Sequence, residues 1–104
     1  MGDSEFLKYV GPPVLHDAVI DGLDVRSGRV EVGLKTPTGL RLRLVFGEAS
    51  DVQEEGAVGM TLYALAEMVS HGPLRRFSFV NWEDDDPAYL NLNAANVSWG
   101  EVGD

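Results

Sequence analysis

A pair of strictly alternating segments, joined by a short turn sequence, constrains the fold of this chain more than any other feature. Residues 30–34 and 40–46 place an apolar side chain at every second position, which is the period of a strand with one buried face. Between them, Pro37-Thr38-Gly39 suits a three-residue loop in which Pro37 begins a type I turn and Gly39 takes the left-handed position. We therefore predict an antiparallel hairpin here.

The register of this hairpin follows from the same pattern. A three-residue loop sets Leu34 opposite Leu42, so that both apolar sets lie on one face. A loop one residue shorter would instead oppose Leu34 to Arg41. On the outer face, Glu31 then becomes a diagonal neighbour of Arg43. The pattern and the turn thus predict the same pairing.

Most of the remaining chain also has the character of strands separated by turns. Ser27-Gly28 has the composition of a two-residue hairpin turn. A shift in the apolar spacing predicts a β-bulge or a tight turn at Gly22. The acidic stretch Glu83–Pro87 joins two alternating runs as a further hairpin. The other predicted strands are residues 14–20, 23–25, 76–82, 89–93 and a continuation over 97–99.

The segment Met60–Val69 supports two interpretations. Leu62, Leu65, Ala66 and Val69 form a helical stripe, and the segment is rich in good helix formers. The same residues also suit a strand that is buried on both faces. Periodicity alone leaves strand and helix open.

We expect one domain that is mainly β, with an antiparallel sheet of about six or seven strands arranged as a sandwich or a curled sheet. The alternative is an α+β fold with one helix over residues 60–70. Pairing should begin after Pro12-Pro13, because two successive prolines remove ladder donors. The polar stretch 47–59 is expected to be irregular, with room for a short edge strand. The expected divisions are a lead-in over 1–13, a folded core over 14–99 and a frayed tail over 100–104.

Composition restricts the classes of function. The formal net charge of -9 repels phosphate backbones, so we expect no nucleic-acid binding and at most attraction to a basic protein partner. The absence of cysteine excludes disulfides, thiolate zinc sites and cysteine nucleophiles, and it favours a cytoplasmic location. We expect no membrane association, because no apolar run reaches the length of a membrane helix or a signal peptide. No cofactor-binding motif or catalytic motif is present, so neither a cofactor nor a catalytic residue is predicted.

Three short motifs resemble features of small, largely uncharacterised bacterial proteins. They are Leu15-His16-Asp17-Ala18, the run Leu74–Phe79 and the run Leu90–Ala95. In those proteins the motifs belong to a β-rich domain of similar length, and some relatives are described as immunity proteins against bacterial toxins. The resemblance implies a mainly-β fold and favours the strand interpretation of residues 60–69. It implies no catalytic residues.

The first candidate site is an acidic surface with an aromatic edge. A Trp followed by four carboxylates occupies a predicted hairpin loop, and Tyr89 and Trp99 are further aromatic residues that could lie beside it. Such aromatic residues are favoured at interfaces, although core packing is the more frequent role of a tryptophan. The loop lacks the alternating ligands and the glycine of a calcium loop, so we predict no metal there. The candidate binding residues are Trp82, Glu83, Asp84, Asp85 and Asp86.

The second candidate site is His16-Asp17, which is the only neighbouring pair of a histidine and a carboxylate. A general base or a metal ligand needs such a partner. Adjacent residues on a strand point to opposite faces, so we expect these two side chains not to converge. A buried structural hydrogen bond at the start of a strand is the simpler interpretation of either residue.

Three hypotheses of function follow. The first is a non-enzymatic interaction module that binds a basic partner through the acidic surface with its aromatic edge. An immunity-like protein would be one form of such a module. The second is a small metal-dependent hydrolase centred on His16 and Asp17, which requires a third polar group in a concave site. The third is a structural subunit that self-associates through an exposed strand edge.

Overall fold

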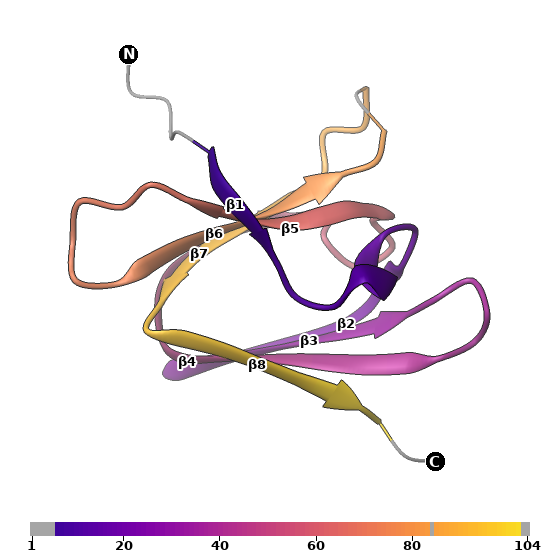
Figure 1. Ribbon diagram of the computed structural model, residues 1–104, viewed down its shortest axis with the longest axis horizontal. Coiled ribbons are helices and arrows are strands. Elements are labelled where there is room, and N and C mark those ends of the chain that lie inside the picture. The colour runs from indigo at the N-terminus through magenta and orange to yellow at the C-terminus, as the bar shows by residue number, and fades with distance from the viewer. Residues whose placement is uncertain (1–5, 84, 103–104) are drawn as a thin grey trace.

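Within the described residues, eight antiparallel strands form one curled, unclosed sheet, whose two halves lie over one another as two layers (Figure 1). The structure, a computed structural model, describes residues 6–83 and 85–102. Neighbouring strands follow the order β1-β5-β6-β7-β4-β3-β2, and β8 pairs with β4 outside this path. The elements are β1 (Phe6–Val10), a 3-10 turn η1 (Pro13–Leu15), β2 (Val19–Arg26), β3 (Gly28–Lys35), β4 (Arg41–Glu55), β5 (Leu62–Met68), β6 (Arg75–Asn81), β7 (Tyr89–Ala94) and β8 (Asn96–Glu101).

The predicted fold class, mainly β with an antiparallel sheet, is confirmed. Figure 1 shows β1, β5, β6 and β7 in one layer and β2, β3 and β8 in the other. The long strand β4 belongs to both layers, because its first half pairs with β3 and β8 while its second half pairs with β7. At the corner, the Ala95 N–H donates to the Gly47 carbonyl at 2.9 Å, so the segment from β7 to β8 follows β4 round the bend.

The hairpin of β3 and β4 has the predicted register. Leu34 pairs with Leu42, and the Thr36 N–H donates to the Leu40 carbonyl at 2.9 Å across the loop. Gly39 has a φ of 91°, the left-handed conformation that the loop type requires. On the outer face, Arg43 Nε lies 3.5 Å from Glu31 Oε1. The alternating pattern and the turn chemistry are therefore sufficient to specify this hairpin.

Two further local predictions are confirmed. The register of β2 against β3 shifts between Ile20 and Gly22, which is the bulge predicted at this point. Arg26 pairs with Arg29, so Ser27-Gly28 forms the two-residue turn.

The segment Met60–Val69 contains a strand, so the helix alternative is wrong. β5 lies between β1 and β6 and pairs with both. Its register shifts between Leu62 and Ala64, and this bulge brings Leu62 and Leu65, three positions apart, into the same core. The bulge therefore produced the spacing that resembled a helical stripe.

The boundaries predicted at both ends of the chain are wrong. β1 precedes the prolines and pairs with β5, since Pro12-Pro13 interrupts only the chain that follows it. The predicted strand over 14–20 begins only at Val19, because Pro13 starts the 3-10 turn instead. The expected tail over 100–104 is paired as far as its described part extends: Glu101 pairs with Leu42, and residues 103 and 104 lie outside the described chain.

The polar stretch 47–59 is largely strand, not irregular chain. β4 continues through it to Glu55, with left-handed residues at Glu48 and Asp51 (φ of 50° each) where the strand bends. With β1 and the longer β4, the described part of the chain contains eight strands, where six or seven were predicted.

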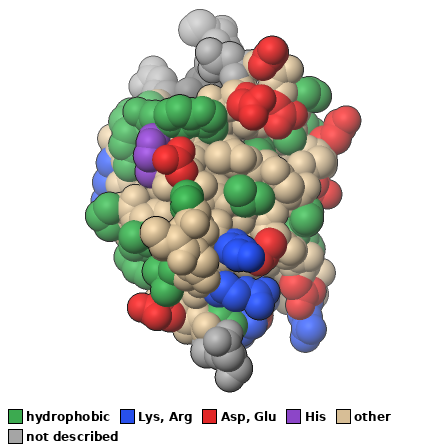
Figure 2. Space-filling view, turned by 90° about the vertical axis from the view of Figure 1, so that its right-hand side faces the viewer, with side chains coloured by type: hydrophobic (Ala, Val, Ile, Leu, Met, Phe, Trp, Pro, Cys, Tyr) green, Lys and Arg blue, Asp and Glu red, His purple; other side chains and the backbone are tan. Residues whose placement is uncertain are grey.

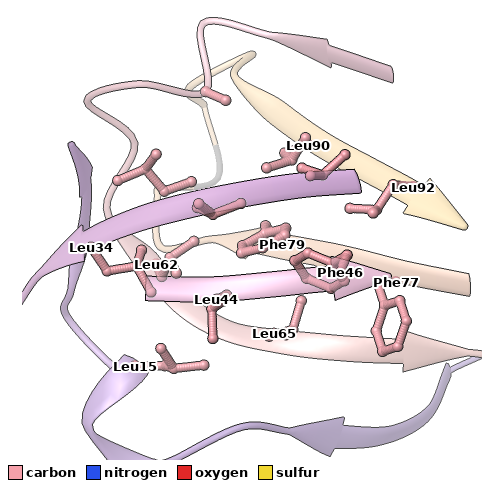
Figure 3. Packing of buried hydrophobic residues seen from close by; sticks show 14 of the residues in the cluster. Leu15, Leu34, Leu44, Phe46, Leu62, Leu65, Phe77, Phe79, Leu90 and Leu92 are labelled. Carbon is pink, nitrogen blue, oxygen red and sulfur yellow. The ribbon is translucent and has the colours of Figure 1, made fainter. Parts of the chain in front are cut away.

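The core fills the space between the two layers (Figure 3). Phe46 of β4 contacts the rings of Phe77 and Phe79 of β6, with centroids 5.2 and 5.8 Å away. The core therefore joins strands of opposite layers. The radius of gyration of 12.9 Å agrees with about 13 Å for a compact domain of about 100 residues.

Candidate functional site

Five exposed rings form a continuous group on the outer side of the β1, β5 and β6 layer. We call this group the aromatic patch; it consists of Phe6, Tyr9, His16, Tyr63 and Trp82. Centroids of neighbouring rings lie between 4.7 Å (Phe6 and Tyr9) and 6.1 Å (Tyr9 and Tyr63) apart. The exposed fractions of the other four residues, Phe6, Tyr9, Tyr63 and Trp82, lie between 41% and 55%. Contiguous exposed apolar surface of this kind typically marks an interaction site.

The bulge in β5 and the end of β6 place the centre of the patch. Tyr63 is the residue at the bulge between Leu62 and Ala64, so its side chain turns outward while Leu62 stays in the core. The Trp82 N–H donates to the Thr61 carbonyl at 2.9 Å, which continues the pairing of β5 and β6 past the last strand residue. As a result, the rings of Tyr63 and Trp82 stack with centroids 5.7 Å apart and planes inclined by 26°.

His16 reaches the patch from the turn after η1. Its Nδ1–H donates to the Tyr63 carbonyl at 3.1 Å, and its ring meets Tyr63 and Trp82 edge-on at 5.3 and 5.0 Å. Asp17, with a φ of 71°, closes the turn, and its N–H donates to the Leu62 carbonyl at 2.9 Å. The turn therefore fixes the imidazole beside the two larger rings.

The expectation that His16 and Asp17 point apart is wrong. They lie in a turn and not on a strand, and His16 Nε2 is 3.8 Å from Asp17 Oδ1. The structural hydrogen bond expected of this pair exists, but it lies at the surface, since the two side chains are 47% and 50% exposed. Asp17 thus adds a carboxylate to the margin of the aromatic patch.

The acidic loop continues directly from Trp82. Glu83 and Asp85 are exposed, and Asp84 lies outside the described residues. Asp86 Oδ1 accepts a hydrogen bond from the Ala88 N–H at 3.1 Å. The side-chain amide of Asn81, together with that N–H, lowers the pKa of Asp86. The Asn81 side chain accepts a hydrogen bond from the Glu83 N–H at 2.9 Å and donates one to the Ala88 carbonyl at 3.2 Å, so the loop is held against the end of β6.

Ion pairing differs between the acidic loop and the strands β2 and β3. Over the part of the chain that the structure describes, Glu83, Asp85 and Asp86 have no ion-pair partner, whereas carboxylates on β2 and β3 are paired with arginines. Those pairs are Arg26 with Asp24, Arg29 and Arg43 with Glu31, and Arg41 with Asp21. Figure 2 shows the side that lies to the right in Figure 1: hydrophobic side chains gather in the upper part beside a histidine and a carboxylate, and Lys and Arg side chains cluster lower down.

Two shallow pockets border Tyr63. One has a volume of about 240 Å³ and lies between Tyr9, Pro12, His16 and Tyr63. The other, of about 370 Å³, is lined by Tyr63, Val80, Asn81 and Trp82. The tyrosine ring therefore stands as a ridge between two open depressions.

The structure brings together some of the predicted site residues and separates others. Trp82, the described acidic residues and the His16-Asp17 pair lie at one end of the molecule. Trp99, which was considered beside Trp82, lies on β8 in the other layer, where it borders a different pocket with Arg43. Both tryptophans are about half exposed, at 48% and 46%, so neither packs in the core.

Sequence reasoning missed Phe6, Tyr9 and Tyr63. The sequence places Phe6 and Tyr9 in a lead-in that has room for a short strand or turn but precedes the expected pairing, and it places Tyr63 in a segment open to strand and helix. The pairing of β1 with β5 and of β5 with β6 assembles them. An outward-facing tyrosine at the break in apolar spacing near Leu62 is the signal that could have indicated one of them.

A metal site has no support within residues 6–83 and 85–102. No group of three or more His, Asp or Glu side chains is placed there to hold a metal ion, so His16 and Asp17 form a pair without a third ligand. Nor does this part of the chain contain a helix that is long and apolar enough to cross a membrane. No protein-family model, curated protein or solved structure matches the sequence or the fold significantly. The resemblance to bacterial immunity-like proteins stays a prediction.

Proposed function

We propose that this protein is a non-enzymatic binding module for a basic protein partner, and that the partner docks on the aromatic patch and the carboxylates beside it. The observation that carries the proposal is the continuous exposed contact from Tyr9 through Tyr63 to Trp82. Exposed stacked rings offer a large apolar contact area with few side-chain torsions to restrict on binding. Such residues are also the commonest anchors of protein interfaces.

Charge favours a basic partner over a neutral or acidic one. Asp17 lies beside His16, and the exposed residues Glu83 and Asp85 follow Trp82 in the chain. Lys or Arg side chains can lie over the faces of Trp and Tyr rings while they approach carboxylates. The net charge of -9 adds a long-range attraction that steers a cationic partner. A toxin-neutralising role, which the resemblance implies, would be one instance of such binding. A cytoplasmic location is part of the proposal. It rests on the absence of cysteine, since small secreted domains are often stabilised by disulfides.

The test begins with capture of partners from a lysate of the native host by the tagged protein. The captured protein is then purified, and its affinity is measured for wild type and for two charge-reversed variants. One variant, Glu83→Lys/Asp85→Lys, reverses the acidic loop. The matched control, Glu48→Lys/Glu101→Lys, makes the same change in net charge at exposed positions of β4 and β8.

The proposal expects a basic partner whose affinity falls at least about tenfold when the acidic loop is reversed, and much less in the control. The difference between the variants should shrink as salt rises toward about 1 M, because the Debye length then falls to about 3 Å. Equal losses in the two variants, or a partner that binds the acidic loop variant as tightly as wild type, would overturn the proposal.

A further inference from the structure

We infer that the segment taken up by the aromatic patch is an extended, proline-rich peptide in the polyproline II conformation with a basic residue at one end. This inference rests on the proposed function, because it specifies the form of the basic partner at the same surface. It follows from the shape of the patch, from its unused hydrogen-bond donors and from the position of the acidic side chains.

The shape of the patch is that of a ridge flanked by two shallow depressions. Tyr9 lies on β1, Tyr63 lies on its neighbour β5 and Trp82 directly follows the next strand, β6. Tyr63 lines both pockets. The neighbouring centroids are 6.1 and 5.7 Å apart, so the row is comparable in length with one turn of polyproline II, about 9 Å. Grooves lined by aromatic rings are the surfaces that receive proline-rich segments in this conformation.

The polar atoms of the same rings are available to a ligand. The Tyr9 and Tyr63 hydroxyls and the Trp82 indole N–H make no hydrogen bond within the described chain, and all three residues are well exposed. A polyproline II peptide has no internal hydrogen bonds, so its carbonyl groups point outward and need donors. A tyrosine hydroxyl or an indole N–H can supply them while the ring packs against proline.

Two acidic side chains, Glu83 and Asp85, follow the Trp82 end of the row in sequence. Asp17 lies beside His16, whose ring meets both Tyr63 and Trp82, whereas the Tyr9 end is bordered by Gly11, Pro12 and Pro13. A basic residue of the ligand would therefore sit at the Trp82 end, and the prolines would extend toward Tyr9. A neutral sugar can stack on the same rings, but the net charge of -9 gives it no long-range attraction, whereas a basic peptide is steered to the surface.

The experiment uses the full chain and three dye-labelled pools of twelve-residue peptides with degenerate filler positions. The first pool has proline at every third position and two arginines at one end. The second replaces the prolines by glycine and keeps the arginines, and the third keeps the prolines and replaces the arginines by glutamine. Binding is measured by fluorescence anisotropy for wild type, for Tyr63→Ala and for the matched control Trp99→Ala.

We expect wild type and Trp99→Ala to bind the first pool at least tenfold more tightly than either other pool. The affinity of Tyr63→Ala for the first pool should be at least tenfold lower than that of wild type. Equal binding of the first and second pools would overturn the polyproline inference while the basic-partner proposal stands. If neither arginine-containing pool binds and a glycan array or the third pool does, both the inference and the proposed function fail. Retained affinity in Tyr63→Ala would remove the assigned site.

Discussion

The ring of Tyr63 stacks on the indole of Trp82, with centroids 5.7 Å apart and planes inclined by 26°, although the two residues are 41% and 48% exposed. Neither ring is needed to fill the core, which the buried residues of both layers already form. The pair is held in place by the bulge in β5 and by the hydrogen bond from the Trp82 N–H to the Thr61 carbonyl. A partner would thus meet a surface whose rings are already ordered, which lowers the entropic cost of binding.

A double-mutant cycle measures this stacking directly. Tyr63→Ala and Trp82→Ala should each lower the free energy of unfolding, and the double variant should lose less than the sum. We expect a coupling of about 0.5–1.5 kcal/mol, the usual worth of an aromatic pair, measured by urea denaturation. Strictly additive effects would show that the rings are not in contact in solution.

The core and the patch should respond very differently to truncation. Phe77 is fully buried and contacts Phe46, so Phe77→Ala should cost about 3–5 kcal/mol. Trp82→Ala removes a larger side chain, yet it should cost no more than about 1.5 kcal/mol, because the indole stays about half exposed. Equilibrium unfolding in urea distinguishes the two. A loss for Trp82→Ala as large as that for Phe77→Ala would mean that Trp82 is structural.

Glu67 makes part of the stability dependent on pH. Its carboxylate is nearly buried, with its side chain 9% exposed, and it accepts two hydrogen bonds from Arg75 at 2.8 and 3.0 Å. The hydrogen bonds from Arg75 lower the pKa of Glu67 below its ordinary value of 4.5. The Glu67–Arg75 pair therefore contributes its full share to the free energy of unfolding above pH 4.5, and this contribution is lost as the pH falls through the lowered pKa.

The free energy of unfolding should therefore fall more steeply below pH 4.5 in wild type than in Glu67→Gln, which has no proton to take up at this position. Glu101→Gln is the control, since it removes an exposed carboxylate from β8. Urea titrations between neutral and acidic pH give the comparison. Parallel pH profiles for wild type and Glu67→Gln would contradict the lowered pKa.

The hairpin loop of β3 and β4 offers a test that isolates backbone conformation. A Cβ added at Gly39 or at Gly72 would meet no atom within 4 Å, but only Gly39 has a left-handed φ, of 91°. Gly39→Ala should therefore destabilise the fold by about 1–2 kcal/mol, and Gly72→Ala by less than about 0.5 kcal/mol. Thermal unfolding of both variants gives the comparison. Equal effects would show that the loop does not require a left-handed residue.

The strands that the sequence could predict are those with one buried face and one solvent-exposed face. In the hairpin of residues 30–46 the alternation is complete and the turn residues agree with it. In β5 the bulge at Tyr63 breaks the period, and burial of Ala66 and Glu67 beside the core residues removes the polar face. In the second half of β4 only Ala49 and Val52 pack against the core, and the pairing with β7 holds the rest, so its sequence resembles a loop.

The candidate site was predictable only in part. Trp82 and the acidic loop are contiguous in sequence, so their proximity needs no fold. The contact between Tyr9 and Tyr63 depends on the pairing of β1 with β5, which the prolines after β1 concealed. His16 joined the patch because a 3-10 turn, and not a strand, places it there.

The central claim, that the aromatic patch is the binding face, is tested most directly by comparing two tryptophans of nearly equal exposure. Calorimetric titration of the captured partner into wild type, Trp82→Ala and Trp99→Ala should show an affinity loss of at least about thirtyfold for Trp82→Ala, which corresponds to a hot-spot cost of about 2 kcal/mol. Trp99→Ala, which changes β8 in the other layer, should bind like wild type. Unchanged affinity in Trp82→Ala, or an equal loss in Trp99→Ala, would contradict the assignment of the binding face.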